Sequence, residues 1–275
     1  METLCVVDEL TYFLEYIHLR VEIEPMEAIQ KWSSRYTEFR EEARFDLCQR
    51  LLQAIKQHQL PSYGAAIVYY AEGWLYDRMG RKQDAITAYK HSLTNFHDAN
   101  LFNIDVELLT NIGSLYQEQG RWSEAESNYR QALERAEQHS DQPGRGGALN
   151  NLGGLYLVQN RSEEAIDCFE GAISALEQVG DRYNAAASRL GLSTAYRDQR
   201  RSQQALDTLV QALEEFHKLG RRREVGVTLA SLALLYQVHG KLAEAKLQYL
   251  EALNIFVKLN DVANSTTTLN NLGLI

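Results

Sequence analysis

The stretch GGALNNLGGLYLVQ, residues 146–159, recurs in altered form every forty residues along the chain. Its tyrosine returns at Tyr76, Tyr116, Tyr156, Tyr196 and Tyr236. An alanine stands nine residues after each tyrosine, at Ala85, Ala125, Ala165, Ala205 and Ala245. A fixed period with small, apolar and aromatic columns is typical of proteins built from stacked repeats. The pattern therefore predicts an all-α solenoid and favours recognition over chemistry.

Each repeat reads as two helices separated by short turns. Two further columns mark these turns, one at Gly80, Gly120, Asn160, Arg200 and Gly240, the other at Asn100, Ser140, Gly180, Gly220 and Asn260. Glycine and asparagine tolerate the left-handed backbone that ends a helix, so both columns predict C-caps. Arg200 interrupts the first column. We expect the left-handed backbone to be unfavourable there, because arginine carries a Cβ.

Five full repeats fit this register, at about 63–100, 101–140, 141–180, 181–220 and 221–260, within a repeat body of 61–275. A sixth, truncated first helix occupies 261–275, and the sequence stops one residue before the next tyrosine is due. A helix without its packing partner exposes an apolar face. We therefore expect a longer protein, which a stop codon directly after Ile275 in the native gene would refute. The exposed C-terminal repeat face also offers a route to self-association.

Residues 1–60 do not follow the forty-residue register. Helical spacing of apolar residues is clear in Leu10–Phe13–Leu14–Ile17 and again in Phe45–Cys48–Leu51–Leu52–Ile55. Because the ends of a solenoid need cover, we predict two or three helices here that form an N-terminal helical cap. A separate effector or partner-binding role for this segment is the alternative.

The order of residue types in each unit resembles the tetratricopeptide repeat (TPR) family. In the second repeat this order is carried by Gly113, Tyr116, Gly120, Ala125, Tyr129 and Ala132. The resemblance covers about 200 of the 275 residues and implies a right-handed solenoid of helix-turn-helix units with a concave groove. The unit is forty residues long against the usual 34, and so is similar to those of kinesin light chains, cell-polarity scaffolds, and bacterial signalling ATPases and caspase-like proteases. The phrases GDRYNAAASRLG (180–191) and LNNLG (149–153) look most like the bacterial group.

The resemblance also implies that the first helices line the groove and bind a protein or peptide ligand. The residues predicted for this site are Tyr70, Trp74, Asn111, Gln117, Asn150, Asn151, Arg189, Arg197, Gln237, Asn270 and Asn271. A side-chain amide both donates and accepts, so the asparagines can pair with the backbone of a peptide of any sequence. Alternatively, they bond the adjacent helix or water. The lysine–asparagine pair of chaperone-binding family members is missing, because Thr110, Ser114, Asn150 and Gly154 occupy its positions.

Arginines make the fourth repeat and its exit locally basic, at Arg182, Arg189, Arg197 and the run Arg221–Arg222–Arg223. They could hold an acidic peptide or a phosphate. The alternative is that they form a solvated face of the repeat.

Composition restricts the remaining function classes. The net charge of −9 argues against nucleic acid as a partner, since a phosphate-binding surface needs concentrated positive charge. No apolar run is long enough to span a membrane, and the start METLCVVDELTYF lacks the basic region of a signal peptide. Cys5, Cys48 and Cys168 have no metal or redox spacing, which favours a reducing, cytoplasmic location.

Nothing in the sequence indicates catalysis. The seven histidines show no metal spacing, and neither a glycine-rich phosphate loop nor a nucleophile elbow is present. We therefore predict no enzyme activity, no cofactor and no metal.

Two hypotheses for function remain. The first is a non-catalytic protein- or peptide-binding scaffold in signalling. The second is the sensor or regulatory arm of a larger bacterial signalling enzyme, a caspase-like protease or a signalling ATPase, that binds a trigger or its own effector domain. The gene sequence beyond Ile275 would distinguish them. The ligand itself is not written in the sequence, because repeat scaffolds share packing residues and differ in their grooves.

Overall fold

The computed structural model describes the backbone of residues 2–274 and the side chains of residues 9–274. Within that range the chain is all helix, without a strand, which confirms the predicted fold class. The helices are α1 (Glu2–Arg20), α2 (Pro25–Glu41), α3 (Phe45–Ile55), α4 (Ser62–Arg78), α5 (Lys82–Asp98), α6 (Asp105–Glu118), α7 (Trp122–Gln138), α8 (Gln142–Val158), α9 (Ser162–Gln178), α10 (Arg182–Asp198), α11 (Ser202–Lys218), α12 (Arg222–Val238), α13 (Leu242–Lys258) and α14 (Val262–Leu272).

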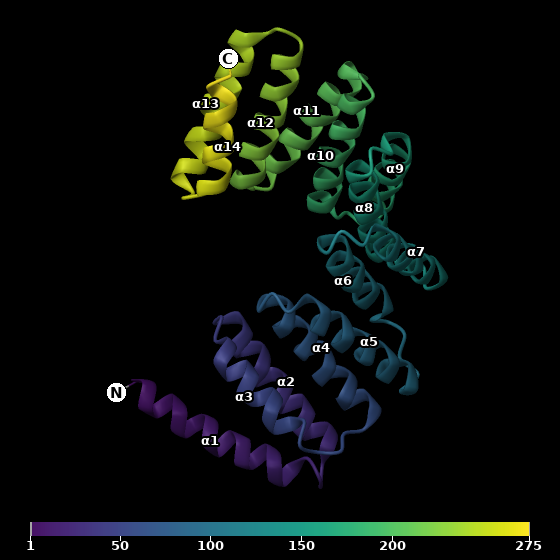
Figure 1. The fold of residues 1–275 in the computed structure, drawn as a ribbon, viewed down its shortest axis with the longest axis vertical. Coiled ribbons are helices and arrows are strands. Elements are labelled where there is room, and N and C mark those ends of the chain that lie inside the picture. The colour runs from purple at the N-terminus through teal and green to yellow at the C-terminus, as the bar shows by residue number, and fades with distance from the viewer. Residues whose placement is uncertain (1, 275) are drawn as a thin grey trace. The chain divides into compact units, whose positions relative to one another are not determined.

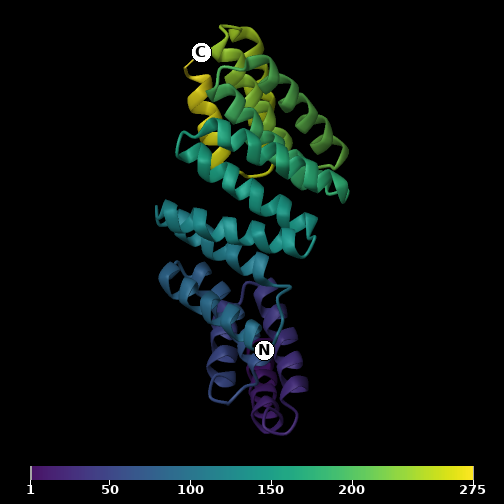
Figure 2. The same cartoon turned by 90° about the vertical axis from the view of Figure 1, so that its right-hand side faces the viewer.

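Contacts divide the chain into two compact units, Met1–Asn128 and Tyr129–Ile275. In the second unit, consecutive helices pair as α8 with α9, α10 with α11 and α12 with α13, and they lie side by side in both views (Figures 1 and 2). In the first unit, α4 pairs with α5 in the same way. The division of the sequence at residue 60 into a cap and a repeat body stays a prediction.

Both predicted columns of C-caps have the left-handed backbone. The φ angles lie between 53° and 73° at all ten positions, five of them glycine and five not. In the first column the next residue closes each helix, because its backbone N–H donates to the carbonyl of the repeated tyrosine, as Arg81 does to Tyr76 at 2.8 Å. This bond is the Schellman closure of a helix. The tyrosine column therefore marks helix ends as well as packing.

Arg200 is the costly member of these columns, with a φ of 58°. A side chain with a Cβ is disfavoured in the left-handed region, whereas glycine adopts it freely. We expect Arg200→Gly to raise the free energy of unfolding by about 0.5–1 kcal/mol, net of the extra freedom that glycine gives the unfolded chain. Urea denaturation would measure this. Asn160→Gly is the control and should change stability less, because asparagine already tolerates this conformation; an equal gain in both variants would contradict the explanation.

Three of the five repeated tyrosines are packing residues whose hydroxyls bond the preceding repeat. Tyr116 and Tyr156 are buried, and their hydroxyls accept hydrogen bonds at 2.8 Å from Lys90 and Arg130 respectively. The Tyr196 hydroxyl instead donates to Glu170 at 2.7 Å, and burial together with this bond raises its pKa to about 12. At these three positions a buried ring therefore joins a repeat to the preceding one and has a satisfied polar end.

Phe169 of α9 fills the space between two first helices. A Cβ built on Gly153 of α8 would stand 2.9 Å from this ring, and a Cβ on Gly191 of α10 would stand 2.4 Å from it. Only glycine allows both helices to approach the ring this closely. The ring is 3% exposed, so it has little room to move aside.

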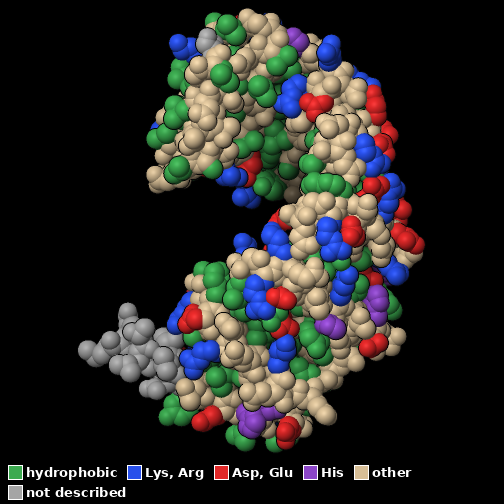
Figure 3. Space-filling model, in the orientation of Figure 1, with side chains coloured by type: hydrophobic (Ala, Val, Ile, Leu, Met, Phe, Trp, Pro, Cys, Tyr) green, Lys and Arg blue, Asp and Glu red, His purple; other side chains and the backbone are tan. Residues whose placement is uncertain are grey.

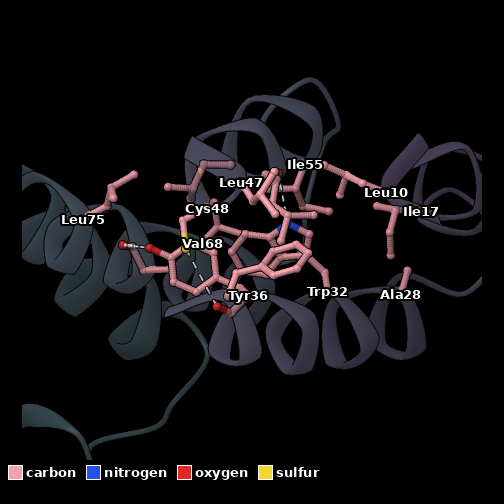
Figure 4. Close-up of a cluster of buried hydrophobic side chains, with 14 of the residues drawn as sticks. Leu10, Ile17, Ala28, Trp32, Tyr36, Leu47, Cys48, Ile55, Val68 and Leu75 are labelled. Atoms are coloured by element: carbon pink, nitrogen blue, oxygen red, sulfur yellow. Dashed lines mark hydrogen bonds between the residues drawn. The ribbon is translucent and has the colours of Figure 1, made fainter. Parts of the chain in front are cut away.

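In the first unit, α1, α2 and α3 share one core with α4. Figure 4 shows a single cluster drawn from these four helices, with Leu10, Ile17, Ala28, Trp32, Tyr36, Leu47, Cys48, Ile55, Val68 and Leu75 labelled. Two polar groups inside it are satisfied, since the Trp32 Nε1–H donates to the Leu51 carbonyl at 3.0 Å and the Tyr36 hydroxyl donates to the Ala71 carbonyl at 2.7 Å. The irregular N-terminal sequence therefore packs directly on the first helix of the first repeat.

Glu72 of α4 is a buried carboxylate in a column that is otherwise apolar, at Ile112, Leu152, Leu192 and Leu232. Lys56, which follows α3, donates to it at 2.7 Å, and the Tyr76 hydroxyl donates at 2.8 Å. A buried charge needs such partners. The N-terminal segment thus supplies the cation that pairs with Glu72.

The second repeat begins later than the others. Its first helix starts at Asp105, whereas α4, α8, α10, α12 and α14 start at 62, 142, 182, 222 and 262. Asp105 is fully buried and lies 2.9 Å from the His97 Nε2 of α5. This contact holds residues 99–104 as a longer connection between α5 and α6.

Candidate ligand-binding face

One side of α8 presents small and amide side chains at helical spacing. Gly147, Asn150, Asn151 and Gly154 follow one another by three, one and three residues, and therefore share a face of the helix. Val158 continues this face by one more turn and is 56% exposed. Asn150 and Asn151 are each half-buried.

Packing does not explain two of these residues. A Cβ built on Gly147 or Gly154 would have no other atom of the protein within 4 Å beyond its own local backbone. The adjacent Gly146 and Gly153 differ, because a Cβ there would stand under 3 Å from Leu176 and Phe169. A glycine inside a helix costs about 0.5–1 kcal/mol relative to alanine. The chain thus carries a helix-weakening residue twice where no internal contact requires it.

Half-buried side chains occupy the corresponding positions of the next two first helices. They are Leu190 and Thr194 on α10, and Ala230 and Leu234 on α12. Leu190 and Ala230 pack against the buried cluster that includes Leu229 and Val225. We call this set, with Gly147, Asn150, Asn151 and Gly154, the open face. It is small, mostly apolar and carries no formal charge.

Asn150 has a partner within the chain. Its Oδ1 accepts a hydrogen bond from the Ser188 hydroxyl of α10 at 3.0 Å. This bond links two consecutive first helices and orients the amide, which leaves the Asn150 NH₂ group as a donor. Ser188 was not part of the predicted site. The signal that could have identified it is a hydroxyl at a position that holds Ala148 one repeat earlier.

Arg189 does not lie on the open face. It occupies a column that holds Leu109, Leu149 and Leu229 in other repeats. Its side chain is 15% exposed and pairs with Glu177 of α9. It lines a hollow of about 630 Å³ bordered by α9, α10 and α11. The structure therefore places this predicted residue among the second helices.

Three other predicted residues of the second unit bond within the chain. Arg197 pairs with its neighbour Asp198 at 3.2 Å. The hydroxyl of the buried Tyr249 donates to the Gln237 Oε1 at 3.1 Å. Burial raises the pKa of Tyr249, and a hydrogen bond with Asn271 acts in the opposite direction. Gln237 and Asn271 thus meet at one buried hydroxyl, whereas Asn270 is exposed.

In the first unit, the predicted aromatic residues are also engaged. The Tyr70 hydroxyl donates to Glu107, and burial, followed by this bond, raises the pKa of Tyr70. The guanidinium groups of Arg40 and Arg78 each lie 5.6 Å from the Trp74 ring, which also contacts Phe45. Asn111 and Gln117 are half-buried on α6. The role of all these residues in ligand binding stays a prediction.

Comparison with known proteins identifies the repeat. Two family profiles, each described as "Tetratricopeptide repeat", match the chain, one at residues 105–178 and 144–216 and the other at 66–95. The chain is a tetratricopeptide repeat protein. The resemblance inferred from the tyrosine and alanine columns is confirmed. No match was found among the curated proteins.

Solved structures share the fold of this TPR protein. BtubC (BKLC) from P. vanneervenii is 24% identical, with a TM-score of 0.61 over 72% of this chain and 81% of that one. A Rap protein complexed with competence and sporulation factor is 15% identical, with a TM-score of 0.67 over 95% and 80%. A signal transduction ATPase with numerous domains and a TPR sensor, from Pyrococcus horikoshii, is 15% identical, with a TM-score of 0.70 over 94% of this chain and 43% of its own. At these identities the similarity shows the fold alone.

Groups that carry chemistry are sparse in the described part of the TPR protein. No cluster of three or more His, Cys, Asp and Glu side chains suited to a metal occurs among residues 9–274, and no described helix is long and apolar enough to cross a membrane. Burial raises the pKa of the Cys48 and Cys168 thiols to about 11 each, so both stay protonated near neutral pH. The Cys5 side chain lies outside the described residues. On the surface drawn in Figure 3, Lys and Arg side chains are intermingled with Asp and Glu.

Proposed function

We propose that this TPR protein is a non-catalytic scaffold that binds an extended segment of a protein or peptide on the open face. The TPR fold itself indicates a protein-interaction scaffold. The observation that carries the finer proposal is the open space at Gly147 and Gly154. A residue without a side chain lets a ligand backbone approach the helix closely. Ligand binding would then explain why α8 contains Gly147 and Gly154 although glycine weakens a helix.

The two asparagines between these glycines support the same proposal. A peptide in extended form presents N–H and C=O groups that need partners when they leave water. Asn151 and the NH₂ group of Asn150 lie at the point where such a peptide would pass. Because the surrounding side chains are uncharged, we expect recognition of backbone and apolar side chains over recognition of charge.

A selection of peptides from a phage-displayed library on the whole chain tests this proposal. We expect the enriched peptides to bind at least tenfold more weakly to Asn150→Ala/Asn151→Ala, because each lost hydrogen bond to a buried peptide group costs about 1 kcal/mol. Gly154→Val should weaken binding to a similar degree by filling the open space. Fluorescence anisotropy with the synthetic peptides measures both effects.

The controls separate binding from folding. Ser188→Ala removes the partner of Asn150 but leaves the amide in place, so binding should change less than in the double variant. Melting curves of all variants should nearly coincide with that of the wild type. Enriched peptides whose affinity is the same for wild type, the double asparagine variant and Gly154→Val would exclude the open face as the site.

The second candidate is the sensor or regulatory arm of a larger signalling enzyme, either a caspase-like protease or a signalling ATPase. Its support is the structural similarity to the Pyrococcus horikoshii ATPase, of which this chain covers 43%. A catalytic domain encoded in the same reading frame, whose activity changes when the open face is mutated, would favour this candidate. Unchanged activity of such an enzyme would count against it.

Three further parts of the proposal rest mainly on the sequence. These are a cytoplasmic location, capping as the role of residues 1–60, and self-association through the C-terminal repeat face. The last has support from exposed apolar side chains on α13 and α14, among them Leu247 at 64% and Leu269 at 54% exposed.

A further inference from the structure

A second hollow lies in the second unit, away from the open face. It has a volume of about 410 Å³ and is bordered by the end of α11, the start of α12 and the end of α13. Its inner wall is apolar, with Phe216, Val225 and Ile255, and its rim is basic, with His217, Arg222 and Lys258. Phe216 and Val225 are buried, and the three rim residues are exposed.

The two rim cations, Arg222 and Lys258, have no counter-charge among the described residues. The three arginines at the start of α12 have different surroundings. Arg221 lies over the Tyr183 ring at 4.9 Å from its centroid, and Arg223 pairs with Asp261 at 2.8 Å. Arg222 borders the hollow, and no described carboxylate lies within 4 Å of it or of Lys258. Arg222 is also the first residue of α12, where the helix dipole favours an anion.

The preceding repeat provides an internal comparison. Forty residues earlier, Arg182 occupies the position of Arg222, and its guanidinium pairs with Glu215 at 2.6 Å. Lys218, which corresponds to Lys258, also pairs with Glu215, at 3.0 Å. The hollow at that place is smaller, about 250 Å³.

In the hollow at Arg222 the three acids that line the earlier hollow are absent. Ile255, Asn254 and His217 stand in the positions of Glu215, Glu214 and Glu177. Arg222 and Lys258 therefore retain the two cations of the earlier repeat, whereas the carboxylate that pairs with those cations is replaced by the apolar side chain of Ile255. A carboxylate from outside the chain would restore the pairing seen one repeat earlier, and an apolar group beside it would cover the wall.

We propose that this hollow binds an acidic peptide segment of a partner protein, with a bulky apolar side chain against Phe216 and Ile255 and an adjoining Asp or Glu carboxylate on Arg222. The chain as a whole carries a net charge of −9, so this cationic rim is a local exception that complements an acidic partner. The site is separate from the open face, and each can fail without the other.

The test uses the whole chain and a fluorescein-labelled probe peptide, Gly-Asp-Glu-Phe-Glu-Asp-Gly. We expect saturable binding that weakens as salt rises, because an exposed ion pair is screened. Ile255→Glu places inside the chain the carboxylate that the peptide would supply, as Glu215 does in the preceding repeat. This variant and Arg222→Ala should each raise the Kd at least tenfold.

Matched controls make the result specific. Arg182→Ala, the same change one repeat earlier, should leave the Kd unchanged, as should Asn150→Ala/Asn151→Ala. A probe with lysine in place of every acidic residue should not bind. Arg222 is exposed, so its replacement keeps the test valid should Ile255→Glu fail to fold.

Three outcomes would overturn the proposal. One is no saturable binding of the acidic probe to the wild-type chain. Another is a Kd that neither Arg222→Ala nor Ile255→Glu changes. The third is direct binding of dodecanoate, measured by calorimetry and weakened by Arg222→Ala, to a chain that does not bind the acidic probe, which would assign the site to a fatty carboxylate.

Discussion

Gly191→Val is expected to lower the free energy of unfolding of the second unit by about 3 kcal/mol. The Cβ of any larger residue would stand 2.4 Å from two atoms of the Phe169 ring. That ring cannot retreat, because Gly153 of α8 bounds its other side and a Cβ there would already be under 3 Å from it. Valine adds two methyl groups at the same point, so the helices must separate. Urea denaturation followed by circular dichroism measures the loss.

Gly154→Val is the matched control for this prediction. It makes the same substitution on a first helix of the same unit, where a new Cβ would meet nothing within 4 Å. Valine and glycine differ by only about 0.5 kcal/mol in helix propensity, in favour of valine. We therefore expect stability within about 0.5 kcal/mol of the wild type. Similar losses in both variants would show that the Phe169 contact is not the cause.

Trp32→Ala is expected to lower the free energy of unfolding of the first unit by about 3–5 kcal/mol. The indole is completely buried, stacks on Tyr36 at 5.1 Å between ring centroids, and donates to the Leu51 carbonyl. Its removal leaves a cavity at the centre of the cluster formed by α1 to α4 and removes the side-chain hydrogen bond to the Leu51 carbonyl. The urea midpoint should fall accordingly.

Amide hydrogen exchange measures which helices are destabilised by this substitution. Stability in a repeat array is a sum of local and nearest-neighbour terms, so amides of α2, α3 and α4 should exchange faster while those of α10 to α13 stay unchanged. Trp122→Ala is the control, because Trp122 is 39% exposed and its loss should cost under about 1 kcal/mol. Uniform acceleration along the whole chain would contradict a locally acting core.

Much of the fold could be predicted because the same residue types recur at the same structural positions in five repeats. The cap columns identify both turns of each repeat, and even the exception at Arg200 adopts the left-handed backbone that its column requires. The tyrosine and alanine columns identify the family. A packing pattern is readable in this way because each position has the same surroundings in every repeat.

The candidate site was less predictable, because it depends on contacts between residues of different columns. No single column indicates that Asn150 bonds Ser188, or that Gln237 and Asn271 share the hydroxyl of Tyr249. Arg189 illustrates the limit most clearly. Its charge suggested a ligand contact, but its column is otherwise leucine, and the guanidinium lies against Glu177. Polar partners are particular to one repeat, so periodicity does not predict them.

The position of Phe169 between Gly153 and Gly191 has a consequence for exchanging repeats as modules. A cut at residue 180 would separate the ring from the second of its two glycines. The residues that correspond to Gly191 elsewhere are Ala71, Asn111, Asn151, Ser231 and Asn271, all of which carry a Cβ. The third repeat can therefore be moved intact only together with the first helix of the fourth, so the transferable cassette ends after α10 and not at the turn before it.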